Sequence, residues 1–393
     1  MVAFYTRFFA TLFVGALSLA ACGGGGGGTS PMTPLSQSAQ TALGTKFAVV
    51  ATGLENPRGI EFGPDGRLYV AEGGSGGSRS TVGRCRQVPA PVGPYLGGFS
   101  GRISAVDVTT GKRTTIARHL PSSQTSSASG GFVSGVADVT FLKGTMYALI
   151  AGAGCSHGLA QTFNSIDRIS QRGNASPIVD LSRFQKSHPV ENPNPPDFEP
   201  DGTWFSFVAV GNALYAVEPN HGEVDVVSRK GSISRLVDVS ATQGHIVPTA
   251  LAFAPFGVPA NGVSRGQFVL GNLNTFDPGS QRHAKVFSLT MQGQLTEITS
   301  GLTAVTGVAV HHKQIYALEA FTGFFAPTPD DANSGKVVRL DPDGSWSTIV
   351  RGLSFPTAMT FDRNTLYISN KGFGQPTNTS GEIVKVQVPD TSD

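Results

Sequence analysis

Five polar side chains recur at one position of an internal repeat, and their oxygens are of the kind that bind hard cations. They end the second strand-like run of five repeats, where one further repeat carries Ala151. The five are Glu72, Glu218, Asn272, Glu319 and Asn370. If these strand ends converge on one face, the side chains form a candidate site for Ca²⁺ or another divalent cation. Alternatively, they cap strand ends by binding backbone N–H groups or solvent.

Three histidines are expected on the same face. His157 and His221 occupy corresponding loops of adjacent repeats, and His245 leads into the next repeat. Imidazole suits proton transfer near neutral pH and the binding of transition metals. The three are therefore candidate ligand-binding residues near Glu218, although no HxH or HxxxH spacing is present. The alternative is that they are polar residues of surface loops.

Two charged residues are expected near the centre of the fold. Arg58 begins the inner strand of the first repeat, where it could bind an anionic ligand or neutralise Glu61 or Asp138. Asp138 falls in the next position, where other repeats carry Gly or Ala. A carboxylate is therefore predicted in a crowded place, and both residues are candidate ligand-binding residues.

A proline-rich insertion at 186–203 gathers further acidic residues on the same expected face. They are Glu191, Asp197, Glu199 and Asp201. Proline prevents strand pairing, so this stretch is predicted to be a loop. It could act as a lid or contribute to a cation site, or it could be a solvated loop.

The motifs of common catalytic centres are missing from the sequence. There is no HExxH, the GxSxG match at 73–77 is a run of glycines around one serine, and no GxGxxG lies between a strand and a helix. We therefore assign no catalytic residue. The cofactor is not identified, and a divalent cation such as Ca²⁺ is the candidate. The net charge is +2, with both signs interspersed along the chain, so nothing favours a nucleic-acid partner.

Internal repetition is the strongest indication of the fold. Runs rich in Val, Ile, Phe and Tyr are separated by turns such as Asp65-Gly66 and Asp343-Gly344. One position recurs six times, at Tyr69, Tyr147, Tyr215, Val269, Tyr316 and Tyr367. Four short antiparallel strands repeated radially form the blade of a β-propeller. The sequence therefore predicts an all-β, six-bladed propeller over residues 46–388, with a tail at 389–393.

The two ends of the repeat array complement each other. The last unit ends at GEIVKVQVP without a fourth strand, whereas KFAVVATGL precedes the first unit and resembles other fourth strands. We expect the N-terminal strand to complete the sixth blade and close the ring.

Three cysteines divide into two classes. Cys85 and Cys155 fall in loops of adjacent repeats on one expected face, which favours a disulfide between them; two reduced thiols are the alternative. Cys22 follows Leu19-Ala20-Ala21, and it is preceded by Arg7 and an apolar run too short to span a bilayer.

This N-terminal pattern resembles a bacterial lipobox. It predicts a signal peptide over residues 1–21, lipid on Cys22 and a flexible Gly/Ser/Pro tether over 22–45. The protein is then an exported lipoprotein attached to the membrane through its lipid. Gly23 fits the periplasmic side of the outer membrane or the cell surface.

The repeats also resemble the ScyD/ScyE family of exported bacterial β-propellers. The segments that carry the resemblance are GLENPRGIEFGPDGRLYVAEGG, YLGGFSGRISAVD, YAVEPNHGEVDVV and GEIVKVQ. The resemblance implies a β-propeller fold and export from the cytoplasm, but it implies no settled biochemical activity. More distantly, the chain is similar to NHL-repeat, gluconolactonase-like and quinoprotein sugar dehydrogenase propellers.

Two functions are compatible with these observations. The first is a monomeric, membrane-tethered module that binds a small molecule, glycan or protein at its loop-rich face. The alternative is a metal-dependent, lactonase-like hydrolase whose cation lies on the propeller axis. Its metal ligands would be the five side chains at the strand ends.

Overall fold

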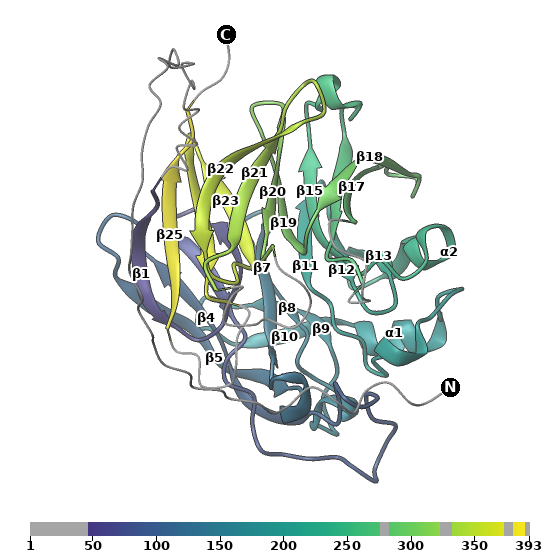
Figure 1. The fold of residues 1–393 in the computed structure, drawn as a ribbon. Helices are drawn as coiled ribbons and strands as arrows, with labels where there is room; N and C mark the ends of the chain where they lie inside the picture. Colours follow the sequence, from purple (N-terminus) through teal and green to yellow (C-terminus); the bar gives the residue numbers. More distant parts are fainter. Residues whose placement is uncertain (1–45, 276–282, 323–331, 373–379, 390–393) are drawn as a thin grey trace, which may run out of the picture. The chain divides into compact units, whose positions relative to one another are not determined.

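Six antiparallel sheets follow one another along the described part of the chain and form the blades of a β-propeller (Figure 1). The structure is a computed structural model that describes residues 46–275, 283–322, 332–372 and 380–389. All of them belong to the second of two units into which the chain divides, Gly44–Asp393. The predicted fold class is confirmed. Cys22 and the segments predicted to be signal peptide and tether lie outside the described residues.

The first three blades contain the longest connections. Blade 1 consists of β2 (Pro57–Phe62), β3 (Leu68–Glu72), β4 (Leu96–Val106), β5 (Arg113–Gln124) and β6 (Val133–Ser134). Blade 2 consists of β7 (Val136–Leu142), β8 (Thr145–Ile150), β9 (Ser165–Ile169) and β10 (Ala175–Asp180). Blade 3 consists of β11 (Ser206–Val210), β12 (Ala213–Glu218), β13 (Glu223–Ser228) and β14 (Ile233–Asp238).

The remaining blades are more regular. Blade 4 consists of β15 (Pro248–Ala254), β16 (Gln267–Asn272), β17 (Ala284–Leu289) and β18 (Leu295–Leu302). Blade 5 consists of β19 (Val305–His311), β20 (Gln314–Glu319), β21 (Gly335–Leu340) and β22 (Trp346–Leu353). Blade 6 consists of β23 (Ala358–Asp362), β24 (Thr365–Asn370), β25 (Gly381–Gln387) and β1 (Ala48–Leu54).

The N-terminal strand closes the ring as predicted. β1 pairs antiparallel with β25, with Ala48 opposite Lys385 and Leu54 opposite Gly381. The two strands lie side by side at one edge of the molecule (Figure 1). The sixth sheet therefore joins both ends of the described chain.

The hydrophobic core is divided between the blades. Each pair of adjacent blades encloses one cluster of buried side chains; between blades 2 and 3, for example, Leu149 and Leu214 share a cluster with Trp204. Because both faces of a blade are covered, strands such as β3 are buried along their whole length. Continuous apolar runs therefore replace strict alternation in the middle strands.

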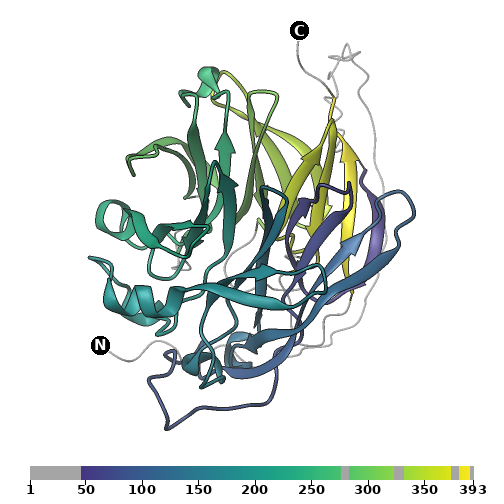
Figure 2. The same ribbon diagram turned by 180° about the vertical axis from the view of Figure 1, so that it is seen from behind.

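Two short helices were not predicted from the sequence. They are α1 (Leu181–Ser187) and α2 (Val239–Gln243), which lie near each other at one side of the molecule (Figure 1, Figure 2). Each begins after an N-cap aspartate: Asp180 accepts a hydrogen bond from Arg183 N, and Asp238 accepts one from Ala241 N. Asp is a strong N-cap residue, so this was the available sequence signal. No helix in the described ranges is long and apolar enough to cross a membrane.

Candidate functional site

A cavity of about 530 Å³ lies along the axis of the ring and is lined by the inner strands of all six blades. Its wall is built mainly from small and apolar residues, among which a few polar side chains are placed. Small-molecule sites typically occupy roughly 300–1,000 Å³ and have this mixed lining. The polar and charged lining residues include Arg58, Glu61, Asp138, Thr140, His311 and Thr360.

A series of side-chain-to-backbone hydrogen bonds connects the inner strands around this cavity. In blades 3 to 6 a hydroxyl group donates to a carbonyl oxygen at the start of the next inner strand. The pairs are Ser206 to Thr249 (2.6 Å), Thr249 to Val305 (2.5 Å), Thr306 to Pro356 (3.0 Å) and Thr357 to Pro57 (2.7 Å). Each bond ties one blade to its neighbour, because the two partners belong to different sheets. We call this series the axial belt.

Blades 1 and 2 place charged side chains near the axial belt. The Arg58 guanidinium donates to the carbonyl of Val133 in β6, the last strand of its own sheet, just before blade 2 begins. The Asp138 carboxylate accepts from the backbone N–H of Phe207 in blade 3, at 3.0 Å. Burial lowers the pKa of Arg58 to about 10, so the guanidinium stays protonated. Both predicted residues line the cavity, and the Asp138 carboxylate also joins blade 2 to blade 3.

Asp138 requires the glycine opposite to it. A Cβ atom on Gly59 would lie 1.7 Å from Asp138 Oδ1, so a side chain there would collide with the carboxylate. Burial raises the pKa of Asp138 well above its usual range, although the N–H groups of Phe207 and Val139 oppose the shift. The crowded carboxylate expected from the sequence is therefore present.

Glu61 is a further ionisable group in the cavity, which the sequence analysis considered only as a partner of Arg58. Its carboxyl accepts hydrogen bonds from Thr140 Oγ1 at 2.6 Å and from Phe141 N at 3.4 Å. Burial raises its pKa to about 7. The sequence did contain a signal for Glu61. It pairs with the recurring Tyr or Val position of its repeat, and the residues that pair with that position in the other blades are Thr, Val or Ala, so a carboxylate is unusual there.

The five polar residues at the strand ends do not meet on the axis. Each bonds to the backbone segment that leads into the inner strand of its own blade. The backbone partners are Glu55 N for Glu72 (2.7 Å), Thr203 N for Glu218 (2.9 Å), Ile246 O for Asn272 (2.7 Å), Thr303 N for Glu319 (2.6 Å) and Ser354 N for Asn370 (2.8 Å). The structure thus places them as separate strand-end contacts.

The candidate metal ligands are also not grouped as a metal ion requires. Within the described ranges, no group of three or more His, Cys, Asp or Glu side chains is arranged to hold one. Glu72 instead faces Arg102 and Ser104 of strand β4, at 2.8 Å and 2.5 Å. Glu319 likewise forms an ion pair with Lys336, at 3.0 Å.

The three predicted histidines all contact the insertion. His157 Nε2 lies 3.1 Å from the carbonyl oxygen of Gly202, and His221 Nε2 lies 2.9 Å from that of Glu199. His245 Nε2 lies 2.9 Å from Asp197 Oδ2. The structure therefore brings them together around residues 197–202, where they hold one loop.

His157 and Glu199 form a fully buried ion pair at 3.4 Å. Burial by itself would lower the pKa of His157, but the hydrogen bond and the charge of Glu199 outweigh it and raise the pKa. Burial would likewise raise the pKa of Glu199, and His157 lowers it. Tyr95 from the other long loop donates to Glu199 Oε1 at 2.5 Å. The imidazole and the carboxyl group are thus buried together beside the two insertions.

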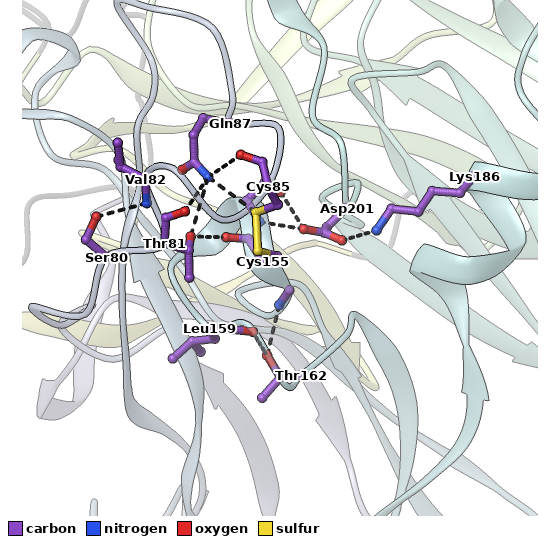
Figure 3. Close-up of a disulfide and its surroundings, with 12 residues drawn as sticks. Ser80, Thr81, Val82, Cys85, Gln87, Cys155, Leu159, Thr162, Lys186 and Asp201 are labelled. Carbon is purple, nitrogen blue, oxygen red and sulfur yellow. Dashed lines mark hydrogen bonds and ion pairs between the residues drawn. A yellow bond between two sulfur atoms is a disulfide. The ribbon is translucent and has the colours of Figure 1, made fainter.

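These two insertions, residues 73–95 and 188–203, pack together over blades 1 to 3, and we call them the cap. The predicted disulfide between Cys85 and Cys155 is confirmed, and it pins the first insertion to blade 2 (Figure 3). Asp201 of the second insertion accepts hydrogen bonds from Ser156 N and Oγ at 2.6 and 2.7 Å. The Arg86 guanidinium lies 4.1 Å from the Phe198 ring centroid, which joins the two insertions directly.

Blade 3 contains buried carboxyl groups that the sequence analysis did not single out. Glu223 lies directly opposite Glu218 in the sheet, and Asp225 lies two residues further along the same strand. Burial raises the pKa of Glu218 to about 7 and that of Asp225 well above its usual range. Glu223 pairs with Arg235, and Asp225 accepts from Trp204 Nε1 at 3.2 Å. None of the three lines the axial cavity.

Comparison with known proteins supports the fold. No protein-family model and no curated protein matches the chain. A protein of unknown function from Bacteroides thetaiotaomicron is 12% identical, with a TM-score of 0.52 over 88% of this chain and 73% of that chain. Virginiamycin B lyase from Staphylococcus aureus is 14% identical, with a TM-score of 0.47 over 88% of this chain and 99% of that chain.

A PQQ-bound aldose sugar dehydrogenase from Streptomyces coelicolor is 12% identical, with a TM-score of 0.47 over 86% of this chain and 96% of that chain. Likenesses at this level of identity concern the fold alone. The likeness to the Bacteroides thetaiotaomicron protein is therefore a likeness of fold.

Proposed function

We propose that this protein is a binding module whose ligand is a small polar molecule held in the axial cavity. The cavity itself is the observation that carries the proposal, because its volume of about 530 Å³ suits a ligand the size of a mono- or disaccharide. On the loop-rich face, the cap already engages the histidines and acidic residues of blades 1 to 3 with one another. The proposed site therefore lies inside the ring.

The wall of the cavity supports a ligand rich in hydroxyl groups. Each inner strand pairs with only one neighbour in its sheet, so the other edge of its backbone faces the axis. The hydroxyls of Thr140 and Thr360 add side-chain partners. Glu61 either donates or accepts a hydrogen bond near neutral pH, since its pKa is raised to about 7.

A blocked cavity provides the test. The probes are a panel of monosaccharides, disaccharides, sugar acids and polyols, and the readout is the thermal shift of the full chain, followed by calorimetry. Ala309 lines the cavity, so Ala309→Phe should abolish the binding of any compound that stabilises the native protein. Ala241→Phe, at an exposed position in α2, is the matched control and should retain binding. A compound that binds the Ala309→Phe variant as well as the native protein would contradict the proposal.

We also propose that the protein is exported and anchored by lipid on Cys22, on the periplasmic side of the outer membrane or at the cell surface. The apolar run before Cys22 and the glycines after it support this location. Metabolic labelling with a fatty-acid analogue should label the native chain and not the Cys22→Ser variant. Equal labelling of both chains would exclude acylation at this position.

A further inference from the structure

Exposed cationic side chains gather at one end of the propeller, in the short connections between the first and second strands and between the third and fourth strands of each blade. We call this end the turn face. Every blade contributes at least one cation to it, and all of them are exposed. They are Lys112, Lys143, Arg172, Arg229, Lys230, Arg265, Lys313 and Arg363.

These cations are not neutralised by neighbouring carboxylates. Within the described part of the chain, none of the eight forms an ion pair, whereas Arg102 and Arg235 near the opposite end pair with buried glutamates. The matching turns also contain acidic residues, but most of these are already engaged. Asp65 and Asp341 are paired with Arg67 and Arg339.

Two further carboxylates of the turn face accept hydrogen bonds from groups of the turns in which they lie. Asp107 accepts hydrogen bonds from Thr109 N and Thr110 N, and Asp343 accepts from Ser345 N and Oγ. Asp362, exposed beside Arg363, is the remaining carboxylate that we find at this end within the described residues. The turn face therefore carries a positive field that its own residues leave unbalanced.

An exposed apolar side chain lies among these cations. Phe256, in the connection between β15 and β16 that also contains Arg265, is 68% exposed. An exposed aromatic side chain on the same face as several cations is the combination that binds membrane interfaces. The cations also lie at turn tips around the whole ring, rather than in a groove that would follow a polymer strand.

We propose that the turn face binds an anionic lipid surface, with Phe256 inserted at the interface. Each cation held near such a surface strengthens binding by about fivefold, and the attraction decays within a Debye length. This inference is independent of the cavity ligand, since no residue of the axial belt takes part in it.

The test uses the full chain with Cys22→Ser, so that no lipid anchor contributes. The probes are phosphatidylcholine vesicles and matched vesicles in which about one third of the lipid is phosphatidylglycerol, at low and high salt. We expect sedimentation with the anionic vesicles and its loss at about 1 M salt. A variant with Lys143, Arg265, Lys313 and Arg363 each changed to Gln should bind roughly 600-fold more weakly. Phe256→Ser should weaken binding and leave its salt dependence in place.

The cap offers the matched control. Arg79, Arg84 and Arg86 are exposed on the other face and form no ion pair in the described residues. Changing these three to Gln should leave vesicle binding nearly unchanged. Equal binding to neutral vesicles, loss of binding in the cap variant instead, or binding to soluble polyphosphate without binding to vesicles would each overturn the proposal. Thermal unfolding of each variant verifies that it is folded.

Discussion

Blades 1 to 3 and blades 4 to 6 share one architecture but are held together by different chemistry. In the described residues of blades 4 to 6, threonine hydroxyls connect neighbouring inner strands at 2.5 to 3.0 Å. In blades 1 to 3, the Asp138 carboxylate joins blade 2 to blade 3, the Arg58 guanidinium bonds within blade 1, and only Ser206 makes a belt bond through a hydroxyl. A disulfide and a buried ion pair also fasten the cap to these blades. Neutral hydroxyls connect the blades at little electrostatic cost, whereas buried charges make stability depend on pH and the disulfide makes it depend on redox state.

The disulfide gives the largest expected difference between the two halves. Cys85 and Cys155 are separated by 70 residues, and closing a loop of that length stabilises the native state by about 4 kcal/mol in the chain-entropy model. The Cys85→Ala, Cys155→Ala double variant should lose about this much free energy of unfolding in denaturant titrations. Hydrogen exchange should rise first in β4 and β8, next to the cap, and later in β16 and β20.

Reductant supplies the control for this prediction. It should lower the stability of the native chain to that of the double variant, and it should leave the double variant itself unchanged. If exchange rose equally in all six blades, the disulfide would stabilise the whole ring and the contrast between the halves would be wrong.

A second difference between the halves is a pH dependence that originates in blades 1 and 3. The pKa values of Glu61 and Glu218 are raised to about 7 in the native state, against about 4.3 in an unfolded chain. The native state therefore binds more protons in this window, and the free energy of unfolding should fall as pH rises from about 4.5 to about 7. Each group contributes at most about 1.4 kcal/mol per pH unit.

Glutamine substitutions isolate these two groups. The Glu61→Gln, Glu218→Gln double variant should show a shallower decline of stability across this pH window in urea titrations. A decline as steep as that of the native chain would assign the effect to other groups, such as Asp138 and Asp225, whose pKa values burial also raises.

The regular features of this propeller could be predicted from the sequence because they arise from local pattern. Strand runs, Asp-Gly turns and the missing fourth strand of the last unit specify six blades and the closing strand without knowledge of long-range contacts. The disulfide could be predicted from the same alignment of repeats, because that alignment places Cys85 and Cys155 in loops on one face.

The partners of the polar side chains could not be predicted in this way. Arg58 and Glu218 bond to backbone groups that only the packing of neighbouring segments brings near. The three histidines were expected on one face, but their contacts depend on the path of a proline-rich loop that has no periodic pattern. The pKa of Glu61 likewise results from burial in a cavity formed by all six blades.

The smallest expected effect tests a single link of the axial belt in the regular half. Thr306→Val keeps the shape of the side chain and removes the hydroxyl that donates to the Pro356 carbonyl at 3.0 Å. A buried carbonyl then loses its partner, which costs about 1 to 2 kcal/mol. Thr296→Val, on the exposed outer strand β18, is the matched control and should change stability by less than about 0.5 kcal/mol. Equal losses in both variants would mean that the belt hydroxyl adds nothing beyond ordinary strand packing, and blades 4 to 6 would then be held together by their apolar clusters.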